Sequence, residues 1–493
     1  MNLCAVILAA QDCAALHSKQ ALHARKLAGS TVLGVLRKTL AQLGVRDVAC
    51  VVGEHQEQVR KALGEDMAYV LQEERRGTGH AVLQVTSFLE SRDGLTLILP
   101  GDNPLVRPET LQQAIRVMSE KALDALLLTA QAPLGAPLDW VEYDAAGEVL
   151  AVHRAELHKI ELSPTEAEGS ESANAPFGLK PRLPGAASLV ADDRAVSRQR
   201  PVSSGIFIFR TPMLLSALGQ LGSQNPADGR LDLTQTFPIL RAVGRQVATL
   251  DIPLDEVRHI RSLADFSMAQ RLLSWRQAER LMAEGVEIQQ PESSLFEGDI
   301  QVGRDTVIEP HVILRGDVQI GEDVRICSGA QIYQTKIGQG SSIAPHTVIE
   351  DSEIGANCQI GPNSYLQAGT ELQDDCLLAA GCHLANCQLG ARVEVEAHAR
   401  LVDVEVGSDC RIGAGCNTVN RKLNGQSART VLGSMVVLGS QSSLLAPVHI
   451  GDQAVVGSLS VITEDVPPLA LAIARQRQEN QHEWVRQRLL REN

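Results

Sequence analysis

The sequence predicts two domains of different fold classes, an α/β doubly wound sheet domain followed by a parallel β-helix built from hexapeptide repeats. From Val302 onward, an aliphatic residue recurs at every sixth position and is often followed by glycine. The first half of the chain instead alternates short apolar runs with helical stretches. Between the two, Phe266 to Glu284 forms a strong helical pattern that ends at Gly285 and would join the domains.

In the first half, each apolar run predicts a buried strand, and the stretches between the runs predict helices. The predicted strands and helices are, in order, Cys4–Ala10 (strand), Thr31–Leu43 (helix), Asp47–Gly53 (strand), Glu54–Leu63 (helix), Leu95–Leu99 (strand), Glu109–Lys121 (helix) and Ala125–Ala130 (strand). This alternation predicts a mostly parallel, doubly wound sheet, which binds ligands beyond the carboxyl ends of its strands. The loop after Ala10 and the segment Pro100–Asp102 lie there.

The six-residue period predicts the β-helix. Six residues are too few for a helical repeat, but they fit one flat face of a β-helix turn with one inward aliphatic residue. A glycine, asparagine or aspartate after the inward residue suits a tight corner, where a positive φ is cheapest. Two runs keep the spacing strictly and three later positions continue it: Val302, Ile308, Leu314, Ile320, Ile326 and Ile332; Ile354, Ile360, Leu366, Leu372, Leu378 and Leu384; and Ile412, Ile450 and Val456.

These patterns divide the chain into a sheet domain at 1–261, a linker helix at 262–285, a β-helix at 286–467 and a C-terminal tail at 468–493. Within the first domain, residues 156–200 are polar, rich in proline, serine, glutamate and arginine, and without a clear period. We interpret them as a surface insertion.

The composition limits the possible partners and compartment. The formal net charge is −14 and no basic stripe appears, so nucleic acid is not expected as the main partner. None of the ten cysteines forms a CxxC pair, so zinc is not expected, and Cys376 and Cys382, one hexad apart, should stack as small buried hydrophobes. The apolar N-terminus lacks a basic region, and no apolar run is long enough to span a membrane. We therefore expect a cytoplasmic protein.

Ordered motifs along the whole chain resemble one enzyme family. Val6–Ala10, Gly77–Ala81 and Pro100–Leu105 have the order and spacing of a nucleotidyltransferase, and Glu284–Val286, the hexads, Leu445–Gly451 and Leu471–Arg475 extend the likeness to the C-terminus. The chain resembles the bifunctional N-acetylglucosamine-1-phosphate uridyltransferase/glucosamine-1-phosphate acetyltransferase family. The resemblance implies an α/β doubly wound nucleotidyltransferase domain followed by a left-handed parallel β-helix of hexapeptide repeats, assembled as a homotrimer. It also implies acetylation of a sugar phosphate by acetyl-CoA between subunits, and Mg²⁺-dependent transfer of UMP from UTP in the sheet domain.

The resemblance implies nucleotide-binding roles for Lys19, Gln72, Gly77, Thr78 and Gly101. The family's glycine-rich phosphate loop is replaced here by Gln11–Leu16, which has no glycine, no arginine and an acidic residue facing a polyanion. Lys19 would then substitute for the family's lysine. Two interpretations of Gln72, Gly77 and Thr78 remain open: a surviving base pocket, or a structural strand-to-helix turn.

Asp102 matches the family's metal-binding aspartate, which would hold Mg²⁺ with the substrate phosphates. Its family partner is an asparagine, and our alignment places Arg261 there. A fixed positive charge opposes a cation by Coulomb repulsion, unless the arginine itself neutralises phosphate. Ser203 stands where the family has a sugar-contacting asparagine, and His153 stands near its glutamate. The sugar pocket is therefore predicted to be rebuilt or abandoned.

The acetyltransferase site also departs from the family. Ala397 stands at the position of the general-base histidine and Arg400 at that of a tyrosine, while Gln367 and Ala385 replace an arginine and a lysine. The adjacent His398 should point inward or away from the site, because neighbouring residues on a face point to opposite sides, unless a register slip makes it the catalytic base.

Three positions do match the family where it binds acetyl-CoA or sugar: Asn420, Ser440 and Arg475. Two hypotheses of different classes follow. The chain is either an enzyme of amino-sugar nucleotide synthesis with substituted side chains, or a family-derived trimeric scaffold or ligand-binding regulator without turnover. A changed substrate, with the 156–200 insertion as a new lid, is a third.

Overall fold

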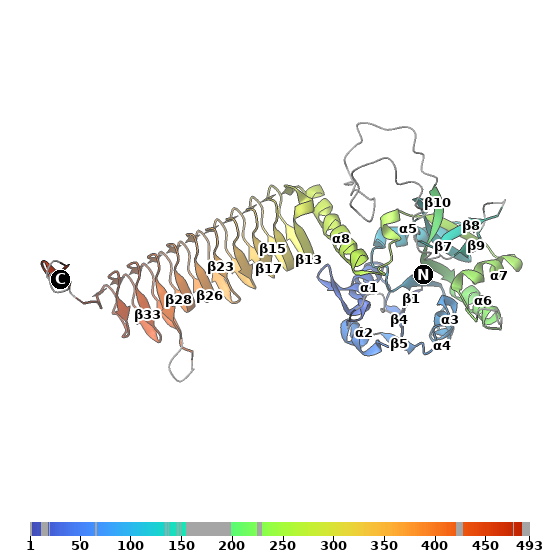
Figure 1. Ribbon diagram of the computed structural model, residues 1–493, viewed down its shortest axis with the longest axis horizontal. Helices are drawn as coiled ribbons and strands as arrows, with labels where there is room; N and C mark the ends of the chain where they lie inside the picture. Colours follow the sequence, from blue (N-terminus) through green and yellow to red (C-terminus); the bar gives the residue numbers. More distant parts are fainter. Residues whose placement is uncertain are drawn as a thin grey trace, which may run out of the picture. The chain divides into compact units, whose positions relative to one another are not determined.

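The computed structural model describes residues 2–10, 18, 20–64, 67–133, 136, 138–144, 147, 149–153, 199–223, 229–420, 427–476 and 478–485. The chain divides into two compact units, one made of Met1–Lys26 and Thr31–Ala269 and the other of Leu27–Ser30 and Gln270–Asn493 (Figure 1). The loop at 11–16, Lys19 and nearly all of the expected insertion lie outside the described residues.

The first unit is built on a nine-stranded sheet. Its main path runs β11 (Val247–Asp251), β7 (Ala125–Pro133), β10 (Gln199–Arg210), β6 (Leu95–Pro100), β1 (Leu3–Ala9), β4 (Asp47–Val52) and β5 (Ala68–Leu71), with β8 (Trp140–Tyr143) and β9 (Val149–His153) beside β10. The predicted doubly wound sheet is confirmed. Only β10 breaks the parallel order of the main path, because it runs antiparallel to both β6 and β7.

Helices cover both faces of this sheet. Alternate residues of β1 face opposite sides, so that Ala5 and Ile7 pack in one apolar cluster and Val6 and Leu8 in the other. The first cluster takes residues of α1 (Val32–Gln42), α2 (Gln56–Leu63) and α5 (Pro108–Glu120), and the second takes residues of α3 (Thr78–Leu83), α4 (Thr86–Glu90), α6 (Thr211–Ser223) and α7 (Thr236–Ala242). The unit also contains the short helices η2 (Leu22–Ala24), η3 (Leu233–Gln235) and η4 (Leu254–Glu256). The short strands β2 (Lys26–Leu27) and β3 (Ser30–Thr31) lie at the two ends of Leu27–Ser30, which belongs to the second unit.

The predicted linker helix is α8 (Leu263–Ala283), and η5 (Pro291–Ser293) follows β12. The β-helix strands after it form two long sheets that share no strand. The first contains β12 (Glu287–Ile288), β14 (Val307–Ile308), β16 (Arg325–Ile326), β19 (Ser342–Ile343), β22 (Gln359–Ile360), β25 (Leu377–Leu378), β27 (Glu394–Val395), β29 (Arg411–Ile412), β32 (Val437–Leu438), β35 (Val455–Val456) and β37 (Leu471–Ala472).

The second long sheet supplies the remaining strands of the β-helix. It contains β13 (Leu295–Val302), β15 (Ile313–Ile320), β17 (Gln331–Tyr333), β18 (Lys336–Ile337), β20 (Val348–Glu350), β21 (Ser352–Ile354), β23 (Tyr365–Leu366), β24 (Thr370–Leu372), β26 (His383–Leu389), β28 (Arg400–Val406), β30 (Asn417–Val419), β31 (Thr430–Leu432), β33 (Ser443–Leu445), β34 (Val448–Ile450) and β36 (Val461–Ile462).

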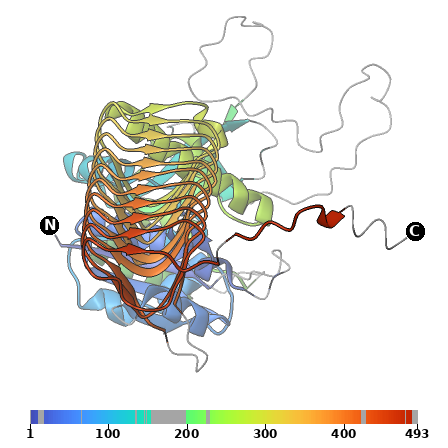
Figure 2. The same cartoon turned by 90° about the vertical axis from the view of Figure 1, so that its left-hand side faces the viewer.

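Within the β-helix, every strand pair is parallel and inward aliphatic residues stack on one another, as Ile308 on Ile326 and Ile326 on Ile343. Figure 2 shows these turns superposed along the coil. The predicted left-handed parallel β-helix is confirmed, and every residue of the predicted hexads is buried.

The predicted reason for glycine after the inward residue was wrong. The left-handed φ values fall three residues after it, at Asp305 after Val302 and Asp323 after Ile320, whereas Gly321 itself has no positive φ. A Cβ built on Gly321 would lie 2.6 Å from the backbone nitrogen of Gln339 in the next turn. Glycine is therefore required by the close stacking of successive turns.

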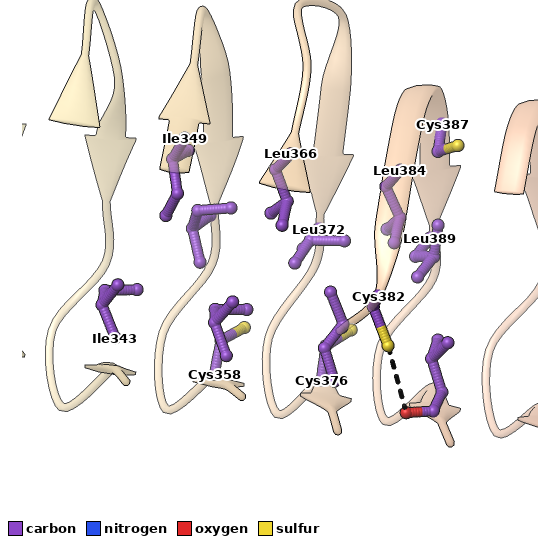
Figure 3. Packing of buried hydrophobic residues seen from close by; sticks show 14 of the residues in the cluster. Ile343, Ile349, Cys358, Leu366, Leu372, Cys376, Cys382, Leu384, Cys387 and Leu389 are labelled. Carbon is purple, nitrogen blue, oxygen red and sulfur yellow. Dashed lines mark hydrogen bonds between the residues drawn. The ribbon is translucent and has the colours of Figure 1, made fainter. Parts of the chain in front are cut away.

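The two cysteines one hexad apart are buried as predicted, but they do not stack on each other (Figure 3). Cys376 lies next to Cys358 of the preceding turn and precedes β25, whereas Cys382 precedes β26. Their thiols donate to carbonyl oxygens, Cys376 to Gly390 at 3.2 Å and Cys382 to Glu396 at 3.4 Å. These cysteines are therefore small hydrogen-bond donors at two different corners.

No helix in the described part of the chain is long and apolar enough to cross a membrane.

Candidate functional site

The carboxyl end of β6 carries the first candidate residues. The backbone N–H of Gly101 donates to Leu8 O at 2.8 Å, and a Cβ on Gly101 would lie 2.9 Å from that same oxygen. Glycine therefore lets the ends of β6 and β1 approach closely. This packing role accounts for Gly101, and its predicted nucleotide contact stays a prediction.

Asp102 follows directly and is 2% exposed. Its carboxylate oxygen Oδ1 accepts a hydrogen bond from His259 Nδ1 at 2.9 Å, and its backbone oxygen accepts one from the Ile260 N–H at 2.8 Å. Burial by itself would raise the pKa of Asp102, but the charge and hydrogen bond of His259, with smaller contributions from His23 and Arg261, hold that pKa below its ordinary value. Asp102 is therefore an ionised carboxylate with a partner inside the protein.

A network of buried hydrogen bonds holds the segment that carries His259. The Asn103 side chain donates to Glu256 O at 3.0 Å. The Glu256 carboxylate, 1% exposed, accepts bonds from the Arg107 N–H at 2.9 Å and the Thr110 hydroxyl at 3.0 Å, at the start of α5. The chain around η4 is thus attached to the chain after β6 at several points, which fixes the imidazole beside Asp102.

His23, on η2, is the second histidine near this carboxylate. It is buried, and its Nε2 has no hydrogen-bond partner among the described residues. Burial lowers the pKa of His23 to about 4, against a smaller opposing effect of Asp102. His23 is therefore a neutral imidazole at neutral pH.

The residues around Asp102 do not fit a magnesium site. Mg²⁺ prefers oxygen ligands in octahedral geometry. Within the described ranges, no group of three or more histidine, cysteine, aspartate or glutamate side chains is arranged to hold a metal ion. His259 contacts Asp102 directly, and the other side chains that act electrostatically on this carboxylate, His23 and Arg261, also bear nitrogen. The sequence drew attention to Arg261 but missed His259, two positions earlier in the same segment.

Gln72, Gly77 and Thr78 are engaged inside the protein. The Gln72 amide nitrogen lies 3.0 Å from His80 Nδ1, and Thr78 Oγ1 accepts a hydrogen bond from the Leu233 N–H at 2.9 Å. Gly77 has φ 106°, and a Cβ there would lie 2.5 Å from Leu231 O. These contacts build a strand-to-helix turn. They favour the structural interpretation of the motif, and a base pocket stays a prediction.

We expect Thr78→Val to lower the free energy of unfolding by about 1 kcal/mol, because the side chain loses the oxygen that accepts the Leu233 N–H. Urea denaturation monitored by circular dichroism measures this change. A variant of unchanged stability that bound UTP more weakly than the parent would instead support the base pocket.

The expected sugar region contains an aromatic cluster that the sequence did not reveal. His153 stacks on Trp140 with ring centroids 4.0 Å apart, and its Nε2 lies 2.6 Å from the Glu142 carboxylate. Ser203 Oγ accepts a bond from the Gly205 N–H at 3.1 Å. His153 and Ser203 therefore have partners on the β8–β9 hairpin and within β10, respectively, which fits a rebuilt pocket.

In the β-helix, His398 does not point inward, and the other predicted alternative, that it points away from the site, stays a prediction. It occupies a corner with φ 60° and is exposed, and its N–H donates to Ala380 O at 3.0 Å. A Cβ on Gly381 would lie 2.6 Å from His398 Nδ1, so the imidazole packs over the preceding turn. The positive φ at His398 arises because the chain reverses at this corner. Ala397 beside it has only a methyl group.

The three residues that match the family's ligand-binding positions lie in different settings. The Asn420 side chain donates to the Asp403 carboxylate, which also accepts a bond from Asn386 Nδ2 at 2.6 Å. Ser440 is half-buried, and a Cβ on the Gly413 next to it would lie 2.5 Å from its backbone nitrogen. Arg475, after β37, is exposed.

Known proteins match both halves of the chain. Residues 5–162 match the MobA-like NTP transferase domain, residues 299–334 and 351–386 match the bacterial transferase hexapeptide of six repeats, and residues 385–417 match the hexapeptide repeat of succinyl-transferase.

The full chain is similar to several proteins called bifunctional protein GlmU. The protein from Stutzerimonas stutzeri is 32% identical over 99% of this chain and 99% of its own length, and that from Brevibacillus brevis is 30% identical over 98% and 96%. The protein from Caldanaerobacter subterraneus is 29% identical over 99% of this chain and 98% of its own length. The suspected resemblance is thereby confirmed, and the chain belongs to the family of bifunctional GlmU proteins.

Proposed function

We propose that this chain is a GlmU family member that no longer makes UDP-N-acetylglucosamine and acts as a ligand-binding scaffold. The observation that carries the proposal is the bond between Asp102 and His259, 2.9 Å long and buried. It engages Oδ1 of the one carboxylate that the uridyltransferase reaction would need for its metal. The proposal extends to a cytoplasmic homotrimer, and the free thiols of the nine described cysteines fit a reducing compartment.

The acetyltransferase half gives independent support. The methyl group of Ala397 takes no proton from a sugar amine, and loss of a general base costs about 10²–10⁴-fold in rate. His398 does not supply the missing base, since it lies at a corner over Gly381. Gln367 and Ala385 also remove the positive charges that would clamp a sugar phosphate.

The exposed Arg475 offers a guanidinium for a phosphate, and Ser440 remains at the matching position. We therefore propose CoA or acetyl-CoA as a ligand of the last turns, and a sugar phosphate or UTP as a weaker candidate for the sheet domain.

Mass spectrometry after incubation with glucosamine 1-phosphate, acetyl-CoA, UTP and Mg²⁺ tests the proposal. A parallel reaction with N-acetylglucosamine 1-phosphate, UTP and Mg²⁺ separates the two halves, and the relative from Stutzerimonas stutzeri serves as the comparison protein. We expect neither product above a boiled control. Acetyl-CoA should nevertheless bind in calorimetry, and Arg475→Ala should weaken that binding.

A specific observation favours a second candidate function, an enzyme with substituted side chains. Asp102 keeps its place at the carboxyl end of β6 and is ionised. Under that alternative, the UDP-sugar forms and Asp102→Asn abolishes it, which overturns the first proposal. A monomeric mass in light scattering would separately contradict the trimer.

A further inference from the structure

We propose that His259 has replaced the divalent cation at Asp102, so that the sheet domain takes no metal there and the Asp102–His259 pair serves as a structural strap. The inference deepens the proposed function and rests on the same site. Its test, however, measures metal binding and stability and does not depend on turnover.

The first argument is geometric. His259 Nδ1 lies 2.9 Å from Asp102 Oδ1, and the two side chains are 12% and 3% exposed. The imidazole occupies Oδ1, so a hard cation would have only the other carboxylate oxygen, Oδ2, to coordinate without displacing His259. Its other oxygen ligands would have to come from substrate phosphates and water, because the side chains that act electrostatically on Asp102 bear nitrogen: His259, His23 and Arg261.

The second argument is that the backbone segment carrying His259 is fixed. On the C-terminal side of His259, the Ile260 N–H donates a hydrogen bond to Asp102 O at 2.8 Å. On its N-terminal side, Asn103 Nδ2 donates one to Glu256 O at 3.0 Å. Glu256 is itself held by the Arg107 N–H and the Thr110 hydroxyl. Moving the backbone segment that carries the imidazole would therefore disturb a network of buried hydrogen bonds, which is costly.

The third argument is electrostatic. A buried carboxylate needs a charged or hydrogen-bonding partner, because an unpaired one loses its hydration without compensation. In a metal site, the cation would be that partner. Here His259 is the partner, and Arg261 adds a positive charge that repels a divalent ion. The requirement of Asp102 for a partner is thus met inside the chain.

Electron paramagnetic resonance of free Mn²⁺ tests the metal part directly. We expect the wild-type protein to leave free Mn²⁺ undepleted at about 1 mM, a concentration at which a site of millimolar or tighter affinity would deplete it measurably. The double variant His259→Asn/Arg261→Asn exchanges two nitrogen groups for amide oxygens and should bind Mn²⁺ at least about tenfold more tightly. Adding Asp102→Asn to that variant should abolish the gained binding, which controls for Mn²⁺ held by other surface carboxylates.

A double-mutant cycle in urea tests the strap. Asp102→Asn and His259→Phe should each raise the unfolding equilibrium constant by at least about tenfold, and the combined variant should raise it by less than the product of the two, because both remove the same interaction. If Asp102 were instead a metal ligand, Asp102→Asn would lower the unfolding equilibrium constant of the metal-free protein, because it would remove a buried charge that lacks a partner.

The outcomes separate this inference from the proposed function. The inference is wrong if the wild-type protein depletes free Mn²⁺ and Asp102→Asn does not. It is also wrong if the effects of Asp102→Asn and His259→Phe are additive. Both results are independent of product formation. If product forms although no Mn²⁺ binds, the structural role of the Asp102–His259 pair remains supported and only the proposed loss of activity is wrong.

Discussion

Replacing Gly338 by alanine is expected to lower the free energy of unfolding of the β-helix by about 3 kcal/mol, although it adds one methyl group. The added Cβ would lie 2.6 Å from the backbone nitrogen of Ala356 and from the carbonyl carbon of Gly355 in the next turn. Neither atom belongs to a flexible side chain that could move aside. The two turns are also joined by the hydrogen bond from the Gly338 N–H to Ile354 O at 2.8 Å. Adjacent turns must therefore separate or distort.

Thermal and urea unfolding followed by circular dichroism measures this loss, and Gly457→Ala is the matched control. Gly457 occupies the same place after an inward aliphatic residue, but its nearest neighbour is Ile473 Cγ1 at 3.1 Å, a side-chain atom that can rotate away. We expect the control to cost much less. Equal losses at the two positions would show that glycine serves some purpose other than stacking. Because each turn contacts only its neighbours, the loss at Gly338 should also weaken pairing in the turns on both sides.

The second large effect is a loss of stability in mild acid that depends on His23. Its pKa is about 4 in the folded protein and about 6.5 in an unfolded chain, so between these pH values the unfolded state binds more protons. Stability should therefore fall as the pH falls from about 6.5 toward 4, by about 3 kcal/mol in total. The shift of Asp102 acts in a lower window, since a carboxylate with a depressed pKa loses its contribution only as the pH falls through that value.

Urea unfolding at a series of pH values between 7 and about 4.5 measures the slope that this linkage predicts. His23→Gln removes the titrating ring and should flatten the profile, while the exposed His449→Gln serves as a control for loss of a histidine elsewhere. A profile that keeps its slope in His23→Gln would assign the acid sensitivity to other groups.

The sequence predicted most of the β-helix but less of the sheet domain. In the β-helix, contacts repeat at a fixed spacing, so an inward residue such as Ile326 is recognised from the period alone. The direction of β10 was not predictable in this way. Its partners β6 and β7 are distant from it in sequence, and an apolar run alone does not distinguish a parallel strand from an antiparallel one. The place of Asp102 was predicted correctly, at the end of a parallel strand.

The partner of Asp102 was missed for a physical reason. Asp102 and His259 are 157 positions apart, and their contact depends on hydrogen bonds made by Asn103 and Glu256. No local pattern marks such a pair. The corner position of His398 was not predicted, because the alternation of side chains along a face does not hold at a corner, where φ is positive.

The thiols in the corners of the β-helix have one further consequence, for how the molecule would come apart. Burial raises the pKa of Cys382 to about 11 and that of Cys387 to about 12, so the reactive thiolates hardly exist while the turns remain closed. Cys376 lies in the same turn as these two and is also buried, while Cys358 is buried in the preceding turn and Cys410 and Cys416 are buried together in a later one. Each thiol becomes open to alkylation only when its own turn opens. The order in which these positions are labelled in denaturant would therefore record, turn by turn, from which end the β-helix unfolds.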